Sequence, residues 1–387
     1  MTWGSLHDLT VLDLTQMLAG PFCSMLLADH GANVIKVEPP EGDLSRLIGP
    51  FFTDDDEKAF GGYFQSVNRN KRSVVLDLKS ATDRDTFKAM AAQADVVIEN
   101  FRVGVMERLD LSYETLAGAN PRLVYAAVRG FGDPRTGQSP YVEWPAFDVV
   151  AQAMGGFMGI TGADEPTKAG PGVGDIVPGM LTAFGILAAL RHAEKTGEGQ
   201  FLDVPMYDAV LALCERIVYQ HSYTRAIPGP EGNRHPLVAP FSIYRAKDGH
   251  VAIACPVDSH WRQLAAFIGR PELGDAPDFA TVKERIANVI ELDAIINGWT
   301  RVRTKAEIAV TLGGQVPFGP VNNIEEIYAD PHVRSHGMLV DLELEGIAGR
   351  AVVAGTPVRL QKTPGGVHRR APHLGEHNDE VLAEFGI

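Results

Sequence analysis

Alternating strand and helix patterns fill the first 130 residues and limit the folds that this chain can adopt. Expected strands cover 9–14, 33–38, 73–78, 95–99 and 122–128, and expected helices cover 20–30, 83–94 and 113–119 between them. Strands that alternate with helices in this way are typical of a parallel sheet with helical connections. The sequence therefore predicts an α/β fold.

The sequence pattern changes after residue 225. Helices are expected over 178–195 and 206–219, and the proline- and glycine-rich stretch 224–236 is typical of a linker. Beyond it, Lys247-Asp248-Gly249 lies between two strand-like runs and predicts a hairpin. Helical patterns then cover 259–268, 282–299 and 305–312. We expect a large domain over 1–225, a small α+β domain over 226–322, and a C-terminal return to the large domain over 323–387.

Charge and cysteine content narrow the partners and the compartment. The net charge is −14, which opposes a broad surface for nucleic acid or anionic membranes. Only three cysteines are present, and none forms a CxxC pair, so no disulfide framework is expected. The N-terminal residues lack a signal-peptide pattern, and the longest apolar stretch, 176–190, is shorter than the roughly 20 residues of a membrane span. We expect a cytoplasmic protein with no nucleic-acid or membrane partner.

Several common site types lack their motifs. Glu38 closes a strand–helix–strand unit, but the preceding turn, 16–21, has no GxGxxG and disfavours a nicotinamide site. No GxSxG elbow of a serine hydrolase is present. The pairs His332/His336 and His373/His377 have helical spacing for a metal, but prolines and glycines flank both pairs and neither has an obvious frame of carboxylates. No metal site is predicted.

Asp175 follows a glycine-rich approach, 170–174, and precedes the long apolar helix. Aspartate is a favoured helix cap, so a structural role is open. A second interpretation is a reactive carboxylate that the helix dipole keeps ionised, with glycines that let a bulky ligand approach. The two roles are compatible.

Basic residues gather around one expected strand. Lys71 and Arg72 precede it, Lys79 follows it, and Arg108 is a further cation. Such residues can bind phosphate groups, whereas a solvated surface patch is the simpler interpretation of the charge alone.

An ordered set of short motifs spans nearly the whole chain. The segments are 11–15, 19–21, 31–39, Gly42-Asp43 with Arg46, 70–73, 76–79, 94–101, Gly174-Asp175, 196–200 with Asp203 and Met206, and 374–377. In this order and spacing the sequence resembles the class III CoA-transferase family, the group of the formyl-CoA transferase and carnitine CoA-transferase relatives.

The resemblance implies a fold and a mechanism. The expected protein has a Rossmann-like large domain built from both chain ends, a small α+β insertion, and an interlocked homodimer. Its activity would move CoA from an acyl-CoA to a free carboxylic acid through an aspartyl-CoA thioester on Asp175. Coenzyme A would be a substrate, and no permanently bound cofactor is expected. The implied CoA contacts are Met17, Leu18, Leu76, Lys79, Asn100, Phe101 and Arg108, with Lys71 and Arg72 as further candidates for the phosphates.

Substrate contacts and alternatives complete the expectations. Asp148 is expected near the nucleophile, and Arg234 and His235 are candidates for an acceptor carboxylate, with short dicarboxylates ranked first. One alternative is a 2-methylacyl-CoA racemase of the same fold, whose Gly-His-Asp run is replaced here by 146–148, Ala-Phe-Asp. Phenylalanine cannot transfer a proton, which disfavours it. A non-catalytic CoA-binding protein is the other alternative.

Overall fold

The computed structural model describes residues 3–387, which form two compact units. The large unit contains the described part of Met1–Phe157, together with Lys168–Ala226 and Pro331–Ile387. The small unit contains Met158–Thr167 and Ile227–Asp330. The sequence did not assign the first of these segments to the small unit, because its link there is non-local: the amides of Glu231 and Gly232 donate to the carbonyls of Ile160 and Gly162.

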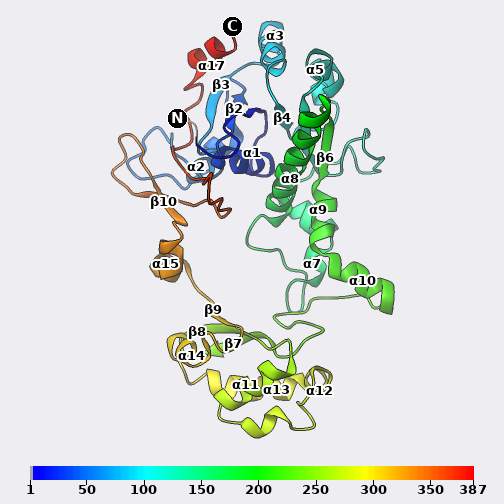
Figure 1. Cartoon of the computed structure of the whole chain (residues 1–387), viewed down its shortest axis with the longest axis vertical. Helices are drawn as coiled ribbons and strands as arrows, with labels where there is room; N and C mark the ends of the chain where they lie inside the picture. Colours follow the sequence, from blue (N-terminus) through cyan, green and yellow to red (C-terminus); the bar gives the residue numbers. More distant parts are fainter. Residues whose placement is uncertain (1–2) are drawn as a thin grey trace. The chain divides into compact units, whose positions relative to one another are not determined.

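A six-stranded parallel sheet is the centre of the large unit (Figure 1). Its strands are β1 (Thr10–Asp13), β2 (Asn33–Glu38), β3 (Arg72–Val75), β4 (Val96–Glu99), β5 (Val124–Arg129) and β6 (Phe201–Pro205). The strand order β3-β2-β1-β4-β5-β6 is that of a doubly wound Rossmann-type sheet, and every neighbouring pair is parallel. The α/β prediction is confirmed.

Helices cover both faces of this sheet. Helices α1 (Ala19–Asp29) and α8 (Val173–Thr196) pack on one face, and α3 (Ala81–Ala91), α4 (Val105–Arg108), α5 (Tyr113–Ala119) and α17 (Asn378–Glu384) pack on the other. Alternate strand residues enter the two cores: Val11 and Val96 face α1 and α8, whereas Leu12 and Val97 face the other helices. Because both faces are buried, the central strand β5, with the sequence VYAAVR, is apolar along almost its whole length.

Helix α8 begins at Val173, five residues before the predicted start at Pro178. Three of its glycines permit close packing: a Cβ at Gly174 or Gly179 would lie 2.5 Å from the carbonyl oxygen of Asp148 or Ala19, and one at Gly185 would lie 2.9 Å from Leu202. By length and composition this helix could cross a membrane, but its inner face packs in the core of the sheet, as core helices of globular proteins do.

The remaining elements of the large unit surround the sheet edges. They are η1 (Leu44–Leu47), α2 (Gly62–Asn68), α6 (Asp148–Met154), α9 (Met206–Leu213), α10 (Glu215–Thr224), α16 (Pro331–Ser335), and the hairpin of β10 (Leu339–Leu342) and β11 (Ala351–Ala354). The single helix predicted over 206–219 is two helices, because Cys214 leaves the helical conformation between them.

The small unit has its own core. Strands β7 (Phe241–Ala246), β8 (Gly249–Ala254) and β9 (Phe318–Pro320) form an antiparallel sheet, and the predicted β7–β8 hairpin is confirmed. Its helices are α11 (Asp258–Phe267), η2 (Pro271–Gly274), α12 (Val282–Ala287), α13 (Val289–Thr300), α14 (Lys305–Leu312) and α15 (Ile324–Ala329); α7 (Phe157–Ile160) lies at the unit boundary. Trp261, Leu292 and Ile308 are fully buried among these elements.

Candidate active site

The turn between β1 and α1 lies at the carboxyl edge of the sheet, where doubly wound folds bind ligands. The side chain of Asn100, directly after β4, fixes this turn with two hydrogen bonds to Gln16. Its Oδ1 accepts from the Gln16 amide at 2.9 Å, and its Nδ2 donates to the Gln16 carbonyl at 2.8 Å. The next residue, Met17, has a φ of 69°, a conformation that costs energy for a residue with a side chain.

A cavity of about 320 Å³ opens beside this turn, and we call it the Asp175 pocket. It brings together five residues that the sequence singled out: Met17, Leu18, Asn100, Phe101 and Asp175. Its other walls include Phe147 and Met206, which the sequence analysis had named, and four residues that no motif marked: Tyr63, Arg102, Arg129 and Trp144. These four come from four separate segments, so only the fold could reveal them.

Asp175 is the third residue of α8, and Gly172 occupies the cap position, so the capping prediction is wrong. The carboxylate is partly buried, and we find no hydrogen bond to it within residues 3–387. Burial and then the negative charge of Asp148 raise the pKa of Asp175 to about 7. The helix dipole therefore does not keep this group fully ionised at neutral pH, because burial and a like charge oppose it.

Asp148 is itself held firmly at the start of α6. Its Oδ1 accepts from the Gly174 amide at 2.8 Å, and Gln152 Nε2 donates to both carboxylate oxygens at 2.8 and 2.9 Å. Gln152 is fully buried, and its Oε1 accepts from the Ala169 amide at 2.9 Å. This chain of contacts fixes the residues that lead into Asp175. The charges of Asp175 and Asp148, after burial, also help raise the pKa of Tyr63 to about 12.

A second cavity, of about 250 Å³, contains most of the other predicted CoA contacts, and we call it the Lys79 pocket. Leu76, Lys79, Phe101 and Arg108 all line it. It shares Gln16 and Phe101 with the Asp175 pocket, so the two cavities meet at the β1–α1 turn. Lys79 and Arg108 are exposed, and neither forms an ion pair with another described residue.

Comparison with known proteins identifies the family. The family model for CoA-transferase family III matches residues 6–378. The chain belongs to this family. This CoA-transferase is 49% identical to succinyl-CoA:mesaconate CoA-transferase of Haloarcula hispanica over 99% of its own length and 97% of the relative. It is 38% identical to succinate–glutarate CoA-transferase of Agrobacterium fabrum, with 98% and 95% covered. A solved CAIB/BAIF family protein from Brucella suis superposes with a TM-score of 0.86 at 34% identity, with 99% and 100% covered.

These findings decide between the functional alternatives. The protein is an enzyme that moves CoA from an acyl-CoA thioester to a free carboxylic acid. The alternative of a non-catalytic CoA-binding protein is therefore wrong.

Two residues that were predicted to contact CoA, Lys71 and Arg72, form ion pairs with carboxylates inside the protein. Lys71 is fully buried and its Nζ lies 3.0 Å from Asp13 Oδ2, with a further bond to Asn68. Arg72 is buried and pairs with Glu380 at 2.7 Å and Glu384 at 2.6 Å. Neither side chain faces the two pockets at the sheet edge. This geometry assigns both residues structural ion pairs and brings neither to the two pockets; Lys71 lines a separate cavity with Arg369 and Arg370.

The predicted substrate contacts Arg234 and His235 lie in the small unit. Arg234 Nε lies 2.6 Å from Asp293 Oδ2, and about half of its side chain is exposed. His235 Nδ1 accepts from the Leu237 amide at 3.1 Å, and its ring packs against Phe241. Their contact with an acceptor acid stays a prediction.

Proposed function

We propose that this CoA-transferase works through a covalent thioester between Asp175 and coenzyme A. The observation that carries the proposal is the position of Asp175, a carboxylate without a hydrogen-bond partner among the described residues, in a pocket that also holds Met17, Leu18, Asn100 and Phe101. A carboxylate that lacks hydrogen bonds is less stabilised as an anion and is a stronger nucleophile than a solvated one.

The proposed reaction has four balanced steps. The Asp175 carboxylate attacks the acyl-CoA carbonyl, which forms a mixed anhydride and releases the CoA thiolate. The thiolate attacks the aspartyl carbonyl of the anhydride, which forms the aspartyl-CoA thioester and releases the donor acid. The acceptor carboxylate attacks this thioester to form a second anhydride and thiolate, and the thiolate attacks the acceptor acyl carbon. Asp175 is then regenerated. Water must be excluded, because hydrolysis would destroy the activated acyl groups.

The two cavities suggest how acyl-CoA would lie. Lys79 and Arg108 offer unpaired positive charge for the phosphates at one end, and Asp175 lies at the other. The pantetheine arm would cross between them past Gln16 and Phe101, which line both cavities. The apolar wall of the Lys79 pocket, formed by Leu76, Val37 and Leu109, suits an adenine ring.

The raised pKa of Asp175 bears on substrate binding and on the attack. In the resting enzyme the group is partly protonated at neutral pH, so the pocket has less negative charge when the negatively charged acyl-CoA binds. In the reaction it must be ionised to attack. A pKa near the working pH allows both states to be populated.

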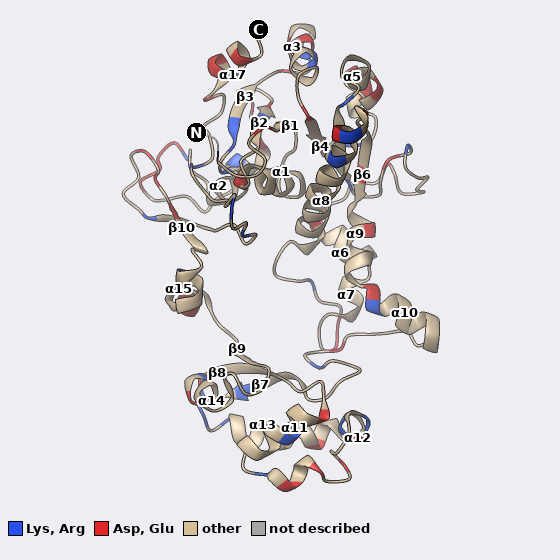
Figure 2. Cartoon of the chain, in the orientation of Figure 1, with Lys and Arg blue, Asp and Glu red and all other residues tan. Residues whose placement is uncertain are grey.

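We propose short dicarboxylic acids as the carboxylate substrates, because the named relatives act on succinate, mesaconate or glutarate. We also propose a homodimer, as the class III family predicts. Helix α8 supports it: no Lys, Arg, Asp or Glu lies between Asp175 and Arg191, so this part of the helix is tan in Figure 2. Met180, Phe184 and Leu187 on its outer face are exposed and follow helical spacing.

The test of the mechanism is the variant Asp175→Ala with a matched control. Asp208 is also the third residue of its helix, α9, but it lies outside both pockets. We expect Asp175→Ala to lose at least about 10³-fold in transfer rate while CoA binding is retained within a few-fold, and Asp208→Asn to keep normal rates. Full transfer by Asp175→Ala would overturn the proposal.

The racemase alternative can be tested in the same preparation. Phe147 lines the Asp175 pocket where the racemase pattern has histidine, and it carries no transferable proton. Incubation with a 2-methylacyl-CoA in deuterated water, without acceptor acid, should give no α-deuterium uptake. Uptake at rates that match transfer would favour the racemase.

A further inference from the structure

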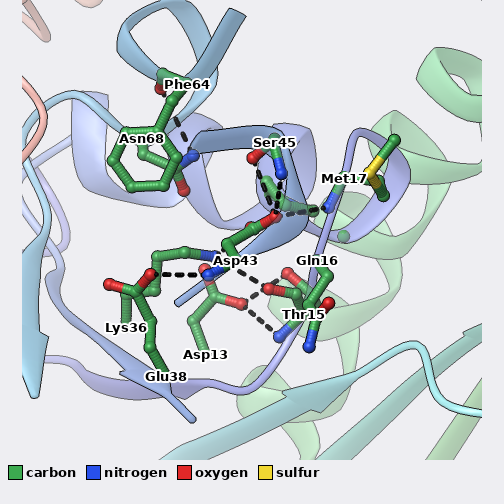
Figure 3. A network of polar contacts seen from close by, with 12 residues as sticks. Asp13, Thr15, Gln16, Met17, Lys36, Glu38, Asp43, Ser45, Phe64 and Asn68 are labelled. Atoms are coloured by element: carbon green, nitrogen blue, oxygen red, sulfur yellow. Dashed lines mark hydrogen bonds and ion pairs between the residues drawn. The ribbon is translucent and has the colours of Figure 1, made fainter. Parts of the chain in front are cut away.

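A buried network of charged groups contacts the turn that joins the two pockets, and Figure 3 shows its residues beside Thr15, Gln16 and Met17. The network forms hydrogen bonds to the backbone of Thr15 and Met17. Asp13 Oδ1 accepts from the Thr15 amide at 2.9 Å, and Lys36 Nζ donates to the Thr15 carbonyl at 2.8 Å. Asp43 Oδ1 accepts from the Met17 amide at 3.2 Å. Three charged side chains, those of Asp13, Lys36 and Asp43, thus hold the turn.

Asp43 and Lys36 form one unit within this network. Their charged atoms are 2.8 Å apart, and both side chains are almost completely buried. Asp43 also accepts from the amide and hydroxyl of Ser45, each at 2.8 Å. Burial alone would lower the pKa of Lys36, but Asp43 and other nearby carboxylates raise it above its usual value. Both members are therefore ionised, which makes the pair strong and its geometry narrow.

The conformation of Met17 indicates what the Asp43–Lys36 pair does. A positive φ is unfavourable for methionine, and only local contacts can hold it there. Asn100 fixes Gln16, but the amide of Met17 itself is held by Asp43. If that contact were lost, the backbone could return to a negative φ, and the Met17 side chain, which lines the Asp175 pocket, would move.

We propose that Asp43, oriented by Lys36, is a positioning residue that holds the Gln16–Met17 turn in the geometry required for CoA transfer. The inference rests on the proposed use of the two pockets as one acyl-CoA site. Asp43 does not line either pocket and touches no substrate in this account. It acts through Met17, and a displacement of about 1 Å in a reacting group can cost about a hundredfold in rate.

Another buried pair in the large unit provides a matched control. Arg69 and Asp29 are also almost completely buried, their charged atoms are 2.7 Å apart, and they make no contact with the turn. The variant Arg69→Met should destabilise the protein without changing kcat. Asp43→Asn and Lys36→Met should both lower kcat at least about tenfold, with KM for acyl-CoA changed less than about threefold. All assays are run well below the melting temperature of the least stable variant.

The decisive test uses the backbone at position 17. Met17→Gly and Met17→Ala both remove the side chain, but only glycine adopts a positive φ freely. With Asp43 intact, the two variants should have kcat values within about threefold of each other. Combined with Asp43→Asn, the glycine variant should turn over at least about fivefold faster than the alanine variant. Position 17 lies in a half-exposed turn, so substitutions there should leave the protein folded. The comparison does not use Lys36→Met and can be made even if that variant does not fold.

Two results would overturn the proposal. One is an Asp43→Asn variant whose kcat matches that of Arg69→Met, and the other is an equal effect of Asp43→Asn in the glycine and alanine backgrounds. Trapping of the Asp175 adduct separates this inference from the proposed mechanism. Failure of the mechanism leaves no adduct in any variant, whereas failure of the positioning role leaves adduct and rate in Asp43→Asn as in the wild type.

Discussion

Two groups of buried or partly buried aspartates at the same edge of the sheet behave in opposite ways. Burial raises the pKa of Asp13, Asp43 and Asp175, but Lys71 and Lys36 lower the pKa of Asp13, and Lys36 with Ser45 lowers that of Asp43. Among the described residues no cation lowers the pKa of Asp175, so burial and the charge of Asp148 raise it to about 7. The presence or absence of partners, rather than burial, separates the structural carboxylates from the proposed nucleophile.

The cations show the same division. Lys71 and Arg72 have internal carboxylate partners and are buried, whereas Lys79 and Arg108 are exposed at a pocket and have none among residues 3–387. Unpaired charge at a cavity is available to a ligand, and paired charge in the core maintains the fold. Four predictions can break or sharpen this comparison.

The largest expected effect is on stability. Asp13→Ala leaves Lys71 buried without its partner, which should lower the free energy of unfolding by about 3–5 kcal/mol. Urea unfolding followed by fluorescence measures it. The double variant Asp13→Leu/Lys71→Met removes both charges and should recover most of the loss. A single variant within about 1 kcal/mol of wild type would contradict a structural role for this pair.

The next effect concerns substrate affinity. Replacing Lys79 and Arg108 with alanine should raise KM for acyl-CoA at least about tenfold and change kcat less than about twofold, because phosphate contacts far from the reacting carbonyl bind ground and transition states equally. Steady-state kinetics decide it. Lys88→Ala, which removes a surface cation paired with Asp110, is the control and should leave KM unchanged. An unchanged KM in the double variant would remove the CoA role from the Lys79 pocket.

The sequence alone could not predict which charged residues are paired inside the protein and which are unpaired at a pocket. Strand β2 was predicted with its observed bounds, because Pro39 and Pro40 end it clearly. The contacts that decide the role of Lys71 and Arg72 are 58 and about 300 residues away in the chain, so their charge alone suggested a phosphate site. The motifs located Asp175, but its pKa depends on Asp148, whose orientation is set by Gln152 and the folded approach to α8.

A smaller effect concerns the pH dependence of transfer. In the free enzyme kcat/KM should rise with pH through an apparent pKa of about 7, because Asp175 must be ionised to attack. The charge of Asp148 raises that pKa, so Asp148→Asn should move the inflection to lower pH, by about one unit. Profiles of kcat/KM from pH 5 to 9 measure the shift. An inflection that stays in place, or moves upward, would contradict the coupling of the two carboxylates.

The smallest effect is the pH dependence of stability. The pKa of Asp175 in the folded protein is about 7, above its usual value of 3.8, so the folded state binds more protons between these values. Protonated Asp175 therefore adds to the free energy of unfolding at low pH, and this contribution is lost as the pH rises towards 7. The variant Asp175→Asn does not titrate and avoids this loss. Its free energy of unfolding relative to wild type should therefore increase between pH 4.5 and 7, by on the order of 1 kcal/mol after solvent screening. Thermal unfolding of both proteins at several pH values would show it; a constant difference would contradict the raised pKa.

The central claim is that Asp175 becomes a thioester of coenzyme A during turnover. Borohydride added while the enzyme turns over acyl-CoA reduces a thioester carbonyl to an alcohol and releases the CoA thiol, which would convert Asp175 to homoserine. Peptide mass spectrometry should then find homoserine at position 175, with Asp148 unchanged and no modification when acyl-CoA is omitted. An unmodified Asp175 in enzyme that continues to exchange CoA would contradict the mechanism.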